Sequence, residues 1–221
     1  EATKILDELI WKMPYARSEI FHALHLCEFK SQPHNRDQHL NLMTQYVQAG
    51  IRTLFMLKEI EKHDKARVLA DALQLELNEI RDSLLLLFSF TFDKEKMLKA
   101  KTAFQQGRKE GIANALEVIE IKVPKEISLR FNHLFETGTV EEKCNSLAVY
   151  FKEEFTYRQV VDEILHDKAY HYHRWTKAAA LHSMIFYEME EKVGWLELAA
   201  DNHDTLLRET AQKILAETVR S

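Results

Sequence analysis

The chain has 221 residues, 30 basic and 35 acidic side chains, and a net charge of −5 at pH 7. A charge this small and negative excludes a general binder of polyanions, and it is also too small to indicate a disordered acidic chain. Only five glycines and three prolines are present, and because these residues interrupt helices most strongly, the composition favours helix. The longest apolar run, LLLLFSF at residues 84–90, is far shorter than the ~20 residues of a membrane span, so no transmembrane segment is expected.

Two cysteines, Cys27 and Cys144, lie far apart in the sequence and show no Cys-x-x-Cys spacing. This usage favours a reduced, cytoplasmic environment, and a disulfide is left open. The chain begins at Glu1 rather than at a methionine. We expect it to be part of a longer protein, whose other segments could supply a membrane tether.

Two long amphipathic helices are expected in the first half of the chain, from Asp37 to about Lys62 and from about Ala66 to Phe90. In both segments apolar residues recur every three or four positions, which places them on one helix face. The two stripes are Leu40, Met43, Val47, Ile51 and Leu54, followed by Leu69, Leu73, Leu77, Ile80, Leu84 and Leu87. Because no stretch alternates with period two for long enough to form a sheet, the predicted fold class is all-α.

Shorter helices in pairs are expected after Asp93. First helices begin near Glu95, Pro124, Thr156 and Glu190, and second helices begin near Arg108, Val140, His171 and Asp204. Steps of roughly 30 residues between helix pairs are typical of an α-α superhelix, a solenoid in which each pair covers the apolar face of its neighbour. We therefore expect residues 1–92 to form an N-terminal helical region that continues into a repeat region at 93–221.

Several helix starts carry capping signals. Asp93 and Asp204 can accept hydrogen bonds from the first free N–H groups of the helices that follow. Thr139 with Glu142, and Thr156 with Gln159, have the spacing of a reciprocal capping box.

Two segments of the repeat region, WTKAAALHSM and LLRETAQKIL, align so that Ala180 matches Ala211. A small residue at this position indicates that two helices cross there with their backbones close together, while Trp175 and Leu207 pack beside the crossing. The aligned bases Lys177 and Arg208 are expected to reach an acid in the turn between paired helices, such as Asp167 or Asp201.

At these positions the chain resembles HEAT repeats, over about residues 93–221. The resemblance lies in an acid in the turn, then a base, an alanine and a terminal aliphatic residue, in LHDKAYHYHRW and AADNHDTLLRE. It implies a HEAT-like solenoid.

The segment LLLLFSFTFDKEKMLKAKTAFQQGRKEGIANALEVIE is in turn similar to a helical region that follows the membrane domain in some bacterial proteins related to ATP/ADP carrier-type nucleotide transporters. That second resemblance implies a location on the cytoplasmic face of a membrane protein. The transport chemistry itself is not expected here, because no glycine loop for phosphate binding is present.

Two histidine-containing segments hold residue types that can bind a metal ion. One contains His166, Asp167, His171, His173 and His182, and the other contains Glu19, His22, His25 and Glu28 at a spacing of three. Zinc requires three or four converging ligands. Because His171 and His173 straddle a helix start, and the second set lacks matching histidines on other helices, no metal ligands are assigned.

No catalytic or cofactor-binding residues are assigned either, because no nucleophile motif is present and paired carboxylates such as Glu141–Glu142 fall at helix starts. The charge pattern does contain one local excess of positive charge. Residues 94–125 hold eight basic and four acidic residues. The candidate anion contacts are Lys94, Lys96, Lys99, Lys101, Arg108 and Lys109.

These patterns predict a non-catalytic helical-repeat scaffold or regulatory domain that binds a protein partner and needs no cofactor. The alternative is a module that binds nucleic acid or phosphate through residues 94–125, and a third reading is an enzyme whose site lies in the solenoid groove. A scattered distribution of lysines favours the scaffold, whereas one continuous basic groove favours the alternative.

Overall fold

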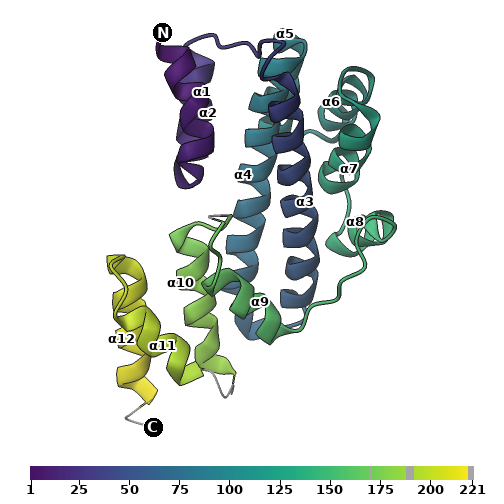
Figure 1. Cartoon of the computed structure of the whole chain (residues 1–221). Helices are drawn as coiled ribbons and strands as arrows, with labels where there is room; N and C mark the ends of the chain where they lie inside the picture. Colours follow the sequence, from purple (N-terminus) through teal and green to yellow (C-terminus); the bar gives the residue numbers. More distant parts are fainter. Residues whose placement is uncertain (170, 188–191, 219–221) are drawn as a thin grey trace. The chain divides into compact units, whose positions relative to one another are not determined.

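All regular structure in residues 1–169, 171–187 and 192–218, which the computed structural model describes, is helical (Figure 1). The all-α prediction is confirmed, and helices close in the chain pack against one another. No helix in the described part of the chain has the length and apolar character that a membrane crossing requires. The helices are α1 (Ala2–Lys12), α2 (Arg17–Leu26), α3 (Arg36–Ile60), α4 (Arg67–Thr91), α5 (Lys94–Gln106), α6 (Lys109–Lys122), α7 (Lys125–Phe135), α8 (Val140–Leu147), α9 (Tyr157–Leu165), α10 (Arg174–Ser183), α11 (Lys192–Ala200) and α12 (Thr205–Thr218).

The chain forms two compact units. Unit 1 comprises Glu1–Leu54 and Leu77–Lys152, and unit 2 comprises Phe55–Glu76 and Glu153–Ser221. These limits differ from the expected division at residue 92, because α3 and α4 each contribute one end to each unit. A helix with an apolar stripe along its whole length can be covered by different partners at its two ends.

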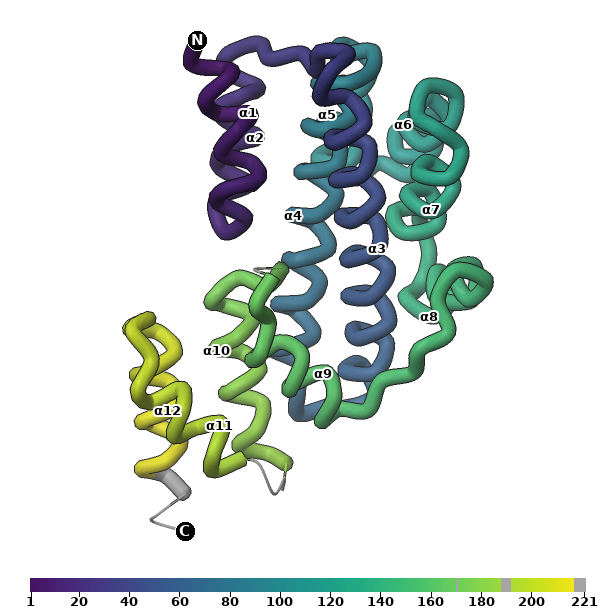
Figure 2. The backbone as a smooth tube through the Cα atoms, in the orientation of Figure 1, coloured from purple at the N-terminus to yellow at the C-terminus, as the bar shows by residue number. Residues whose placement is uncertain are grey.

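The two long helices begin and end within two residues of the positions expected from the sequence. All six residues of the second stripe are buried, and in the first stripe only Leu40 is partly exposed. Within unit 1, Gly50 marks a close approach of helices, since a Cβ atom there would lie 3.2 Å from Leu134 Cδ1 and 3.3 Å from Ile80 Cγ2. Figure 2 shows α3 and α4 side by side.

The shorter helices of unit 1 pack in chain order, α5 against α6, α6 against α7 and α7 against α8, and α1 packs against α2. Phe131 of α7 is fully buried among Phe88, Phe104 and Phe135, with ring centroids 5.3, 6.0 and 4.8 Å away. These tilted and edge-to-face contacts join α4, α5 and α7 into one core.

In unit 2, α9 packs against α10, and α12 packs against both α10 and α11. Glu76 of α4 is 3% exposed. Its carboxylate accepts hydrogen bonds from the His173 backbone N–H, at 2.7 Å, and from the Thr176 hydroxyl. A buried carboxylate at the start of α10 satisfies N–H and O–H donors and favours the positive end of the helix dipole.

The shorter helices expected in pairs after Asp93 begin within three residues of the expected positions wherever the structure describes them. First helices begin at Lys94, Lys125 and Tyr157, and second helices begin at Lys109, Val140, Arg174 and Thr205. The expected start at Glu190 lies outside the described residues. All four capping interactions are present, including both capping boxes, so local sequence signals define these helix starts.

Ala180 of α10 and Ala211 of α12 are both fully buried, and these two helices are in contact. Leu207 is 8% exposed, whereas Trp175, expected to pack beside the crossing, is 64% exposed. The buried residue in the first turn of α10 is Thr176. Trp175, the residue before it, points about 100° away around the helix and is therefore exposed.

The two aligned bases both reach the turn that precedes their helix. Lys177 Nζ donates to the Asp167 backbone carbonyl at 3.1 Å and lies 3.8 Å from the Asp167 carboxylate, as expected. Arg208 instead donates to the Asn202 carbonyl and to the Thr205 hydroxyl, both at 3.5 Å.

Glu28 has a left-handed backbone conformation, with φ 54°. It follows the end of α2 in a Schellman motif, in which the Phe29 N–H donates to the Leu24 carbonyl and the Glu28 N–H to the His25 carbonyl. Glycine is the usual residue at this position because a Cβ atom is strained there, and α5 ends in the same conformation at Gly107, with φ 68°.

We expect Ala211→Leu to destabilise unit 2 by about 1–3 kcal/mol, because the added atoms have no space at a packed helix crossing. Ala216→Leu is the control, since Ala216 is exposed on the same helix. Thermal and urea unfolding of the two variants measures the difference. Equal midpoints would show that Ala211 does not mark a tight crossing.

We also expect Glu28→Gly to stabilise the chain by about 1 kcal/mol, since it relieves the left-handed strain. Gly107→Ala should destabilise it by a similar amount, because a Cβ atom at Gly107 meets nothing within 4 Å and only the backbone conformation opposes it. Urea unfolding of both variants tests the pair, and a loss of stability in Glu28→Gly would contradict the strain argument.

Candidate interaction surface

The histidines at 166–182 do not converge. His166 Nδ1 lies 3.0 Å from a carboxylate oxygen of Asp162 on its own helix, and the His182 ring packs on Phe186. His173 precedes α10, where its backbone rather than its ring binds Glu76. Within the described residues, no three His, Cys, Asp or Glu side chains are grouped as a metal site.

The second histidine set is spread along α2 and past its end, because Glu28 lies in the turn after the helix. Burial lowers the pKa of His25, and the positive charges of Lys94 and Lys101 lower it further. These two lysines are two turns apart on α5 and so lie on a different side of that helix from Lys96 and Lys99.

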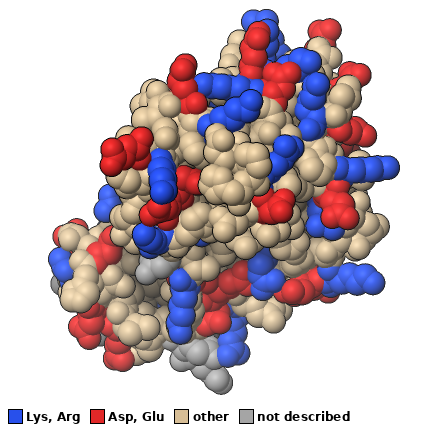
Figure 3. Space-filling model, turned by 45° about the horizontal axis from the view of Figure 1, so that its top comes forward, with Lys and Arg blue, Asp and Glu red and all other residues tan. Residues whose placement is uncertain are grey.

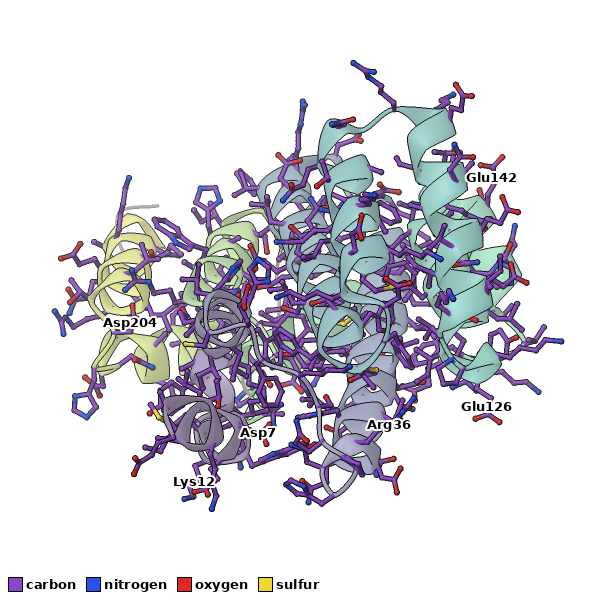
Figure 4. The ribbon with its side chains drawn as sticks, turned by 90° about the horizontal axis from the view of Figure 1, so that it is seen from above. Asp7, Lys12, Arg36, Glu126, Glu142 and Asp204 are labelled. Carbon is purple, nitrogen blue, oxygen red and sulfur yellow. The ribbon has the colours of Figure 1, made fainter. Side chains whose placement is uncertain are left out.

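A polar network that the sequence did not predict joins α1, α3 and α4 in unit 1. His39 of α3 is fully buried, and its Nε2 lies 2.8 Å from Asp7 Oδ1. Its Nδ1 lies 2.6 Å from Ser31 Oγ, which lies 3.0 Å from Thr91 Oγ1. The Asn35 side chain donates to the second Asp7 oxygen at 2.7 Å. Figure 4 shows Asp7 on α1 from above.

The contacts fit a continuous hydrogen-bonded series. A carboxylate only accepts, so His39 Nε2–H donates to Asp7. The other ring nitrogen bonds to the Ser31 hydroxyl, which in turn bonds to the Thr91 hydroxyl. The rings of Trp11 and Phe29 lie 6.4 and 5.8 Å from the imidazole, and they contribute to its apolar surroundings.

A hydrogen-bonded series of Asp, His and Ser also occurs in hydrolases, where a nearby oxyanion hole is required. Here the two backbone N–H groups nearest to Ser31 Oγ in the chain already have acceptors. The Ser31 N–H donates to the Phe90 carbonyl at 2.8 Å, and the Gln32 N–H donates to Asn35 Oδ1 at 2.7 Å. We therefore interpret the network as a structural link that holds α1 against α3 and α4.

The sequence shows that His39 needs a polar partner, but it does not show which residues provide one. His39 lies one helical turn before Met43 and so falls on the apolar face of α3, where a polar residue requires a partner. Its partner Asp7 is 32 positions away in the sequence, and Thr91, which bonds to its other partner Ser31, is 52 positions away. No local pattern relates residues so far apart.

A pocket of about 600 Å³ lies beside this network, and Asp7, Phe29 and Asn35 form its least exposed lining. The polar atoms of Asp7 and Asn35 are already hydrogen bonded to each other and to neighbouring groups. The remaining charged lining residues, Lys4, Glu28 and Lys30, are exposed and of mixed sign, and His34 is exposed as well.

The lysines of residues 94–125 do not line one groove. Lys96 Nζ lies 3.6 Å from Asp93 Oδ2, and Lys99 Nζ lies 2.7 Å from Glu95 Oε1, so both have carboxylates on or next to their own helix. The hydrogen bond to Glu95 raises the pKa of Lys99. Arg108 and Lys109 are exposed where α6 begins. On the face of the molecule drawn in Figure 3, basic and acidic side chains are interspersed.

A surface groove lies between α5 and α6. We call it the α5–α6 groove, and its volume is about 410 Å³. Half of its lining residues are alanine or glycine, whose short side chains leave the space open. The lining residues are Lys96, Lys99, Ala100, Ala103, Gly111, Asn114, Ala115 and Val118.

The helical hairpin itself creates this groove. Gly107 ends α5 in the left-handed conformation, Arg108 is extended, and α6 returns antiparallel against α5. Near the turn the helices approach closely, since a Cβ atom on Gly111 would lie 3.7 Å from Ala103 Cβ. Ala100 and Ala115 are buried in the floor of the groove, whereas Lys96, Lys99 and Asn114 are exposed at its edges.

We expect Asp7→Asn to lower stability at neutral pH and to remove an acid-sensitive contribution. Burial acts to raise the pKa of Asp7, but the hydrogen bonds from His39 and Asn35 outweigh it and hold the pKa below the ordinary value of 3.8. The ionised carboxylate therefore stabilises the fold fully above about pH 5, and this contribution is lost as the pH falls through the folded-state pKa. Urea unfolding of both proteins between pH 5 and pH 2 measures the difference, and a difference that stays constant over that range would contradict this assignment.

Comparison of the chain with protein-family models, with curated proteins and with solved structures found no match.

Proposed function

We propose that this chain is a non-catalytic helical scaffold or regulatory domain, and that it binds a protein partner through the α5–α6 groove. The observation that carries the proposal is the apolar groove itself, which lies open on the surface of unit 1. In this proposal the domain is cytoplasmic and its paired helices are HEAT-type repeats.

The polar network of unit 1 supports this proposal because its hydrogen bonds already link parts of the fold. The Asp7–His39–Ser31 network satisfies its own donors and acceptors, and its nearest backbone N–H groups are occupied. An apolar groove with a few polar groups at its edge is the usual form of a site that binds a helix from another protein.

The alternative function, binding of nucleic acid or phosphate, requires basic side chains that converge on one surface. Lys96 and Lys99 lie at the edge of the α5–α6 groove. Lys94 and Lys101 lie two turns apart on another side of α5, and Arg108 lies at the start of α6, so these basic residues do not converge. No continuous basic groove crosses the face drawn in Figure 3. The distribution therefore favours the scaffold.

Selection from a displayed library of amphipathic helices tests the proposal. The helices recovered on the purified chain should bind the wild type and Ala113→Trp equally, and they should lose binding to Asn114→Trp, which fills the groove. Ala113 and Asn114 are adjacent exposed residues of α6, and only Asn114 lines the groove, so the two variants are matched. Circular dichroism confirms that both fold.

Two results would overturn the proposal. One is that every recovered helix binds Asn114→Trp as well as it binds the wild type. The other is saturable, salt-dependent binding of single-stranded DNA or polyphosphate that is lost in Lys94→Gln/Lys101→Gln, because such binding is the signature of the alternative.

A further inference from the structure

We infer that the occupant of the α5–α6 groove is an acidic amphipathic helix, with small apolar side chains on its contact face and two carboxylates one turn apart beside them. This inference rests on the proposed function and specifies the chemistry of the partner.

The charges at the groove set the sign of the partner. Two of its eight lining residues are lysines, and none of these described lining residues is acidic. Both lysines lie on α5, at positions 96 and 99. Their spacing of three residues places their Cβ atoms about 5–6 Å apart on one face, which matches carboxylates three or four residues apart on a facing helix.

The carboxylates that now pair with Lys96 and Lys99 do not prevent these lysines from binding the carboxylates of a partner helix. The side chains of Lys99 and Glu95 are 76% and 79% exposed, and those of Lys96 and Asp93 are 51% and 36% exposed. Exposed ion pairs of this kind contribute little to stability, so either lysine can turn toward a carboxylate of a bound helix. The partner helix then gains electrostatic attraction, and the domain loses little stability.

The shape of the groove favours a helix over an extended peptide. The backbone N–H and C=O groups along α5 and α6 are already bonded within each helix, so an extended peptide would find no main-chain partners there. A helix satisfies its own backbone, and its side chains pack into the groove between two helices. Because the floor is formed by Ala100, Ala103, Gly111 and Ala115, small side chains on the occupant allow the closest approach.

The groove has room for about two turns of such a helix. Its lining residues extend from Lys96 to Ala103 on α5 and from Gly111 to Val118 on α6. Eight residues of helix correspond to about 12 Å of axis. One turn beyond Val118 on the same face of α6 lies Lys122, which is exposed. It adds a third basic residue at the end of the groove formed by the start of α5 and the end of α6.

The composition of recovered helices tests the inference. The library carries Glu, Gln or Lys at the positions that flank the contact face, and only helices that fail to bind Asn114→Trp are sequenced. Glutamate pairs three or four residues apart should be enriched. In one recovered helix, changing both glutamates to glutamine should weaken binding about five-fold, and changing both to lysine should weaken it further.

Matched charge reversals on the domain complete the test. Lys99→Glu should weaken binding of the acidic helix and strengthen binding of its lysine version. Lys109→Glu makes the same change in charge at an exposed site outside the groove, and it should change neither affinity by more than about two-fold. Raising the salt concentration should weaken binding of the acidic helix only.

The outcomes separate this inference from the proposed function. Groove-dependent helices without glutamate enrichment, or with equal affinity for the wild type and Lys99→Glu, would overturn the acidic partner and leave the scaffold function standing. If no recovered helix depends on Asn114, both fall together.

Discussion

The burial of two long apolar stripes is the constraint on which the rest of the fold depends. α3 and α4 each run for 25 residues, and neither can bury its stripe against the other alone. At the C-terminal end of α4 every residue from Ser83 to Phe90 is buried, which requires neighbours on all sides. In unit 1 the aromatic cluster around Phe131 supplies part of that cover, and in unit 2 α10 is fixed to α4 through Glu76.

Polar interactions then decide which helix lies where. The apolar stripes would accept many arrangements of short helices, because hydrophobic burial is not directional. A buried imidazole or carboxylate is directional, since each donor and acceptor left without a partner costs about 1–3 kcal/mol. His39 with Asp7 fixes α1 in unit 1, and Glu76 with the start of α10 does the same in unit 2.

The positions of the polar side chains also bear on function. The most conspicuous chemical groups of this chain, its histidines and its lysine-rich segment, are divided among turns, helix edges and local ion pairs. The α5–α6 groove has no evident structural role, and its hollow arises from four small residues at the helix contact. The proposed scaffold function depends on the shape of this groove and on the sign of two charges.

Periodicity and capping residues alone determined the all-α class, the two long helices and the starts of the shorter ones, because those signals are local. The N-cap at Asp93 and the capping box at Thr139 each act within the first turn of a helix, so they do not depend on the tertiary structure. The sequence also marked Ala180 and Ala211 as buried positions, although it placed Trp175 beside them, and Trp175 is exposed.

Only the tertiary structure decided the limits of the two units and the partners of His39. Each of these depends on which residues from distant parts of the chain meet. Sequence spacing reports the side of a helix on which a residue lies. It does not report which other helix faces that side, because that choice is made by packing over the whole core.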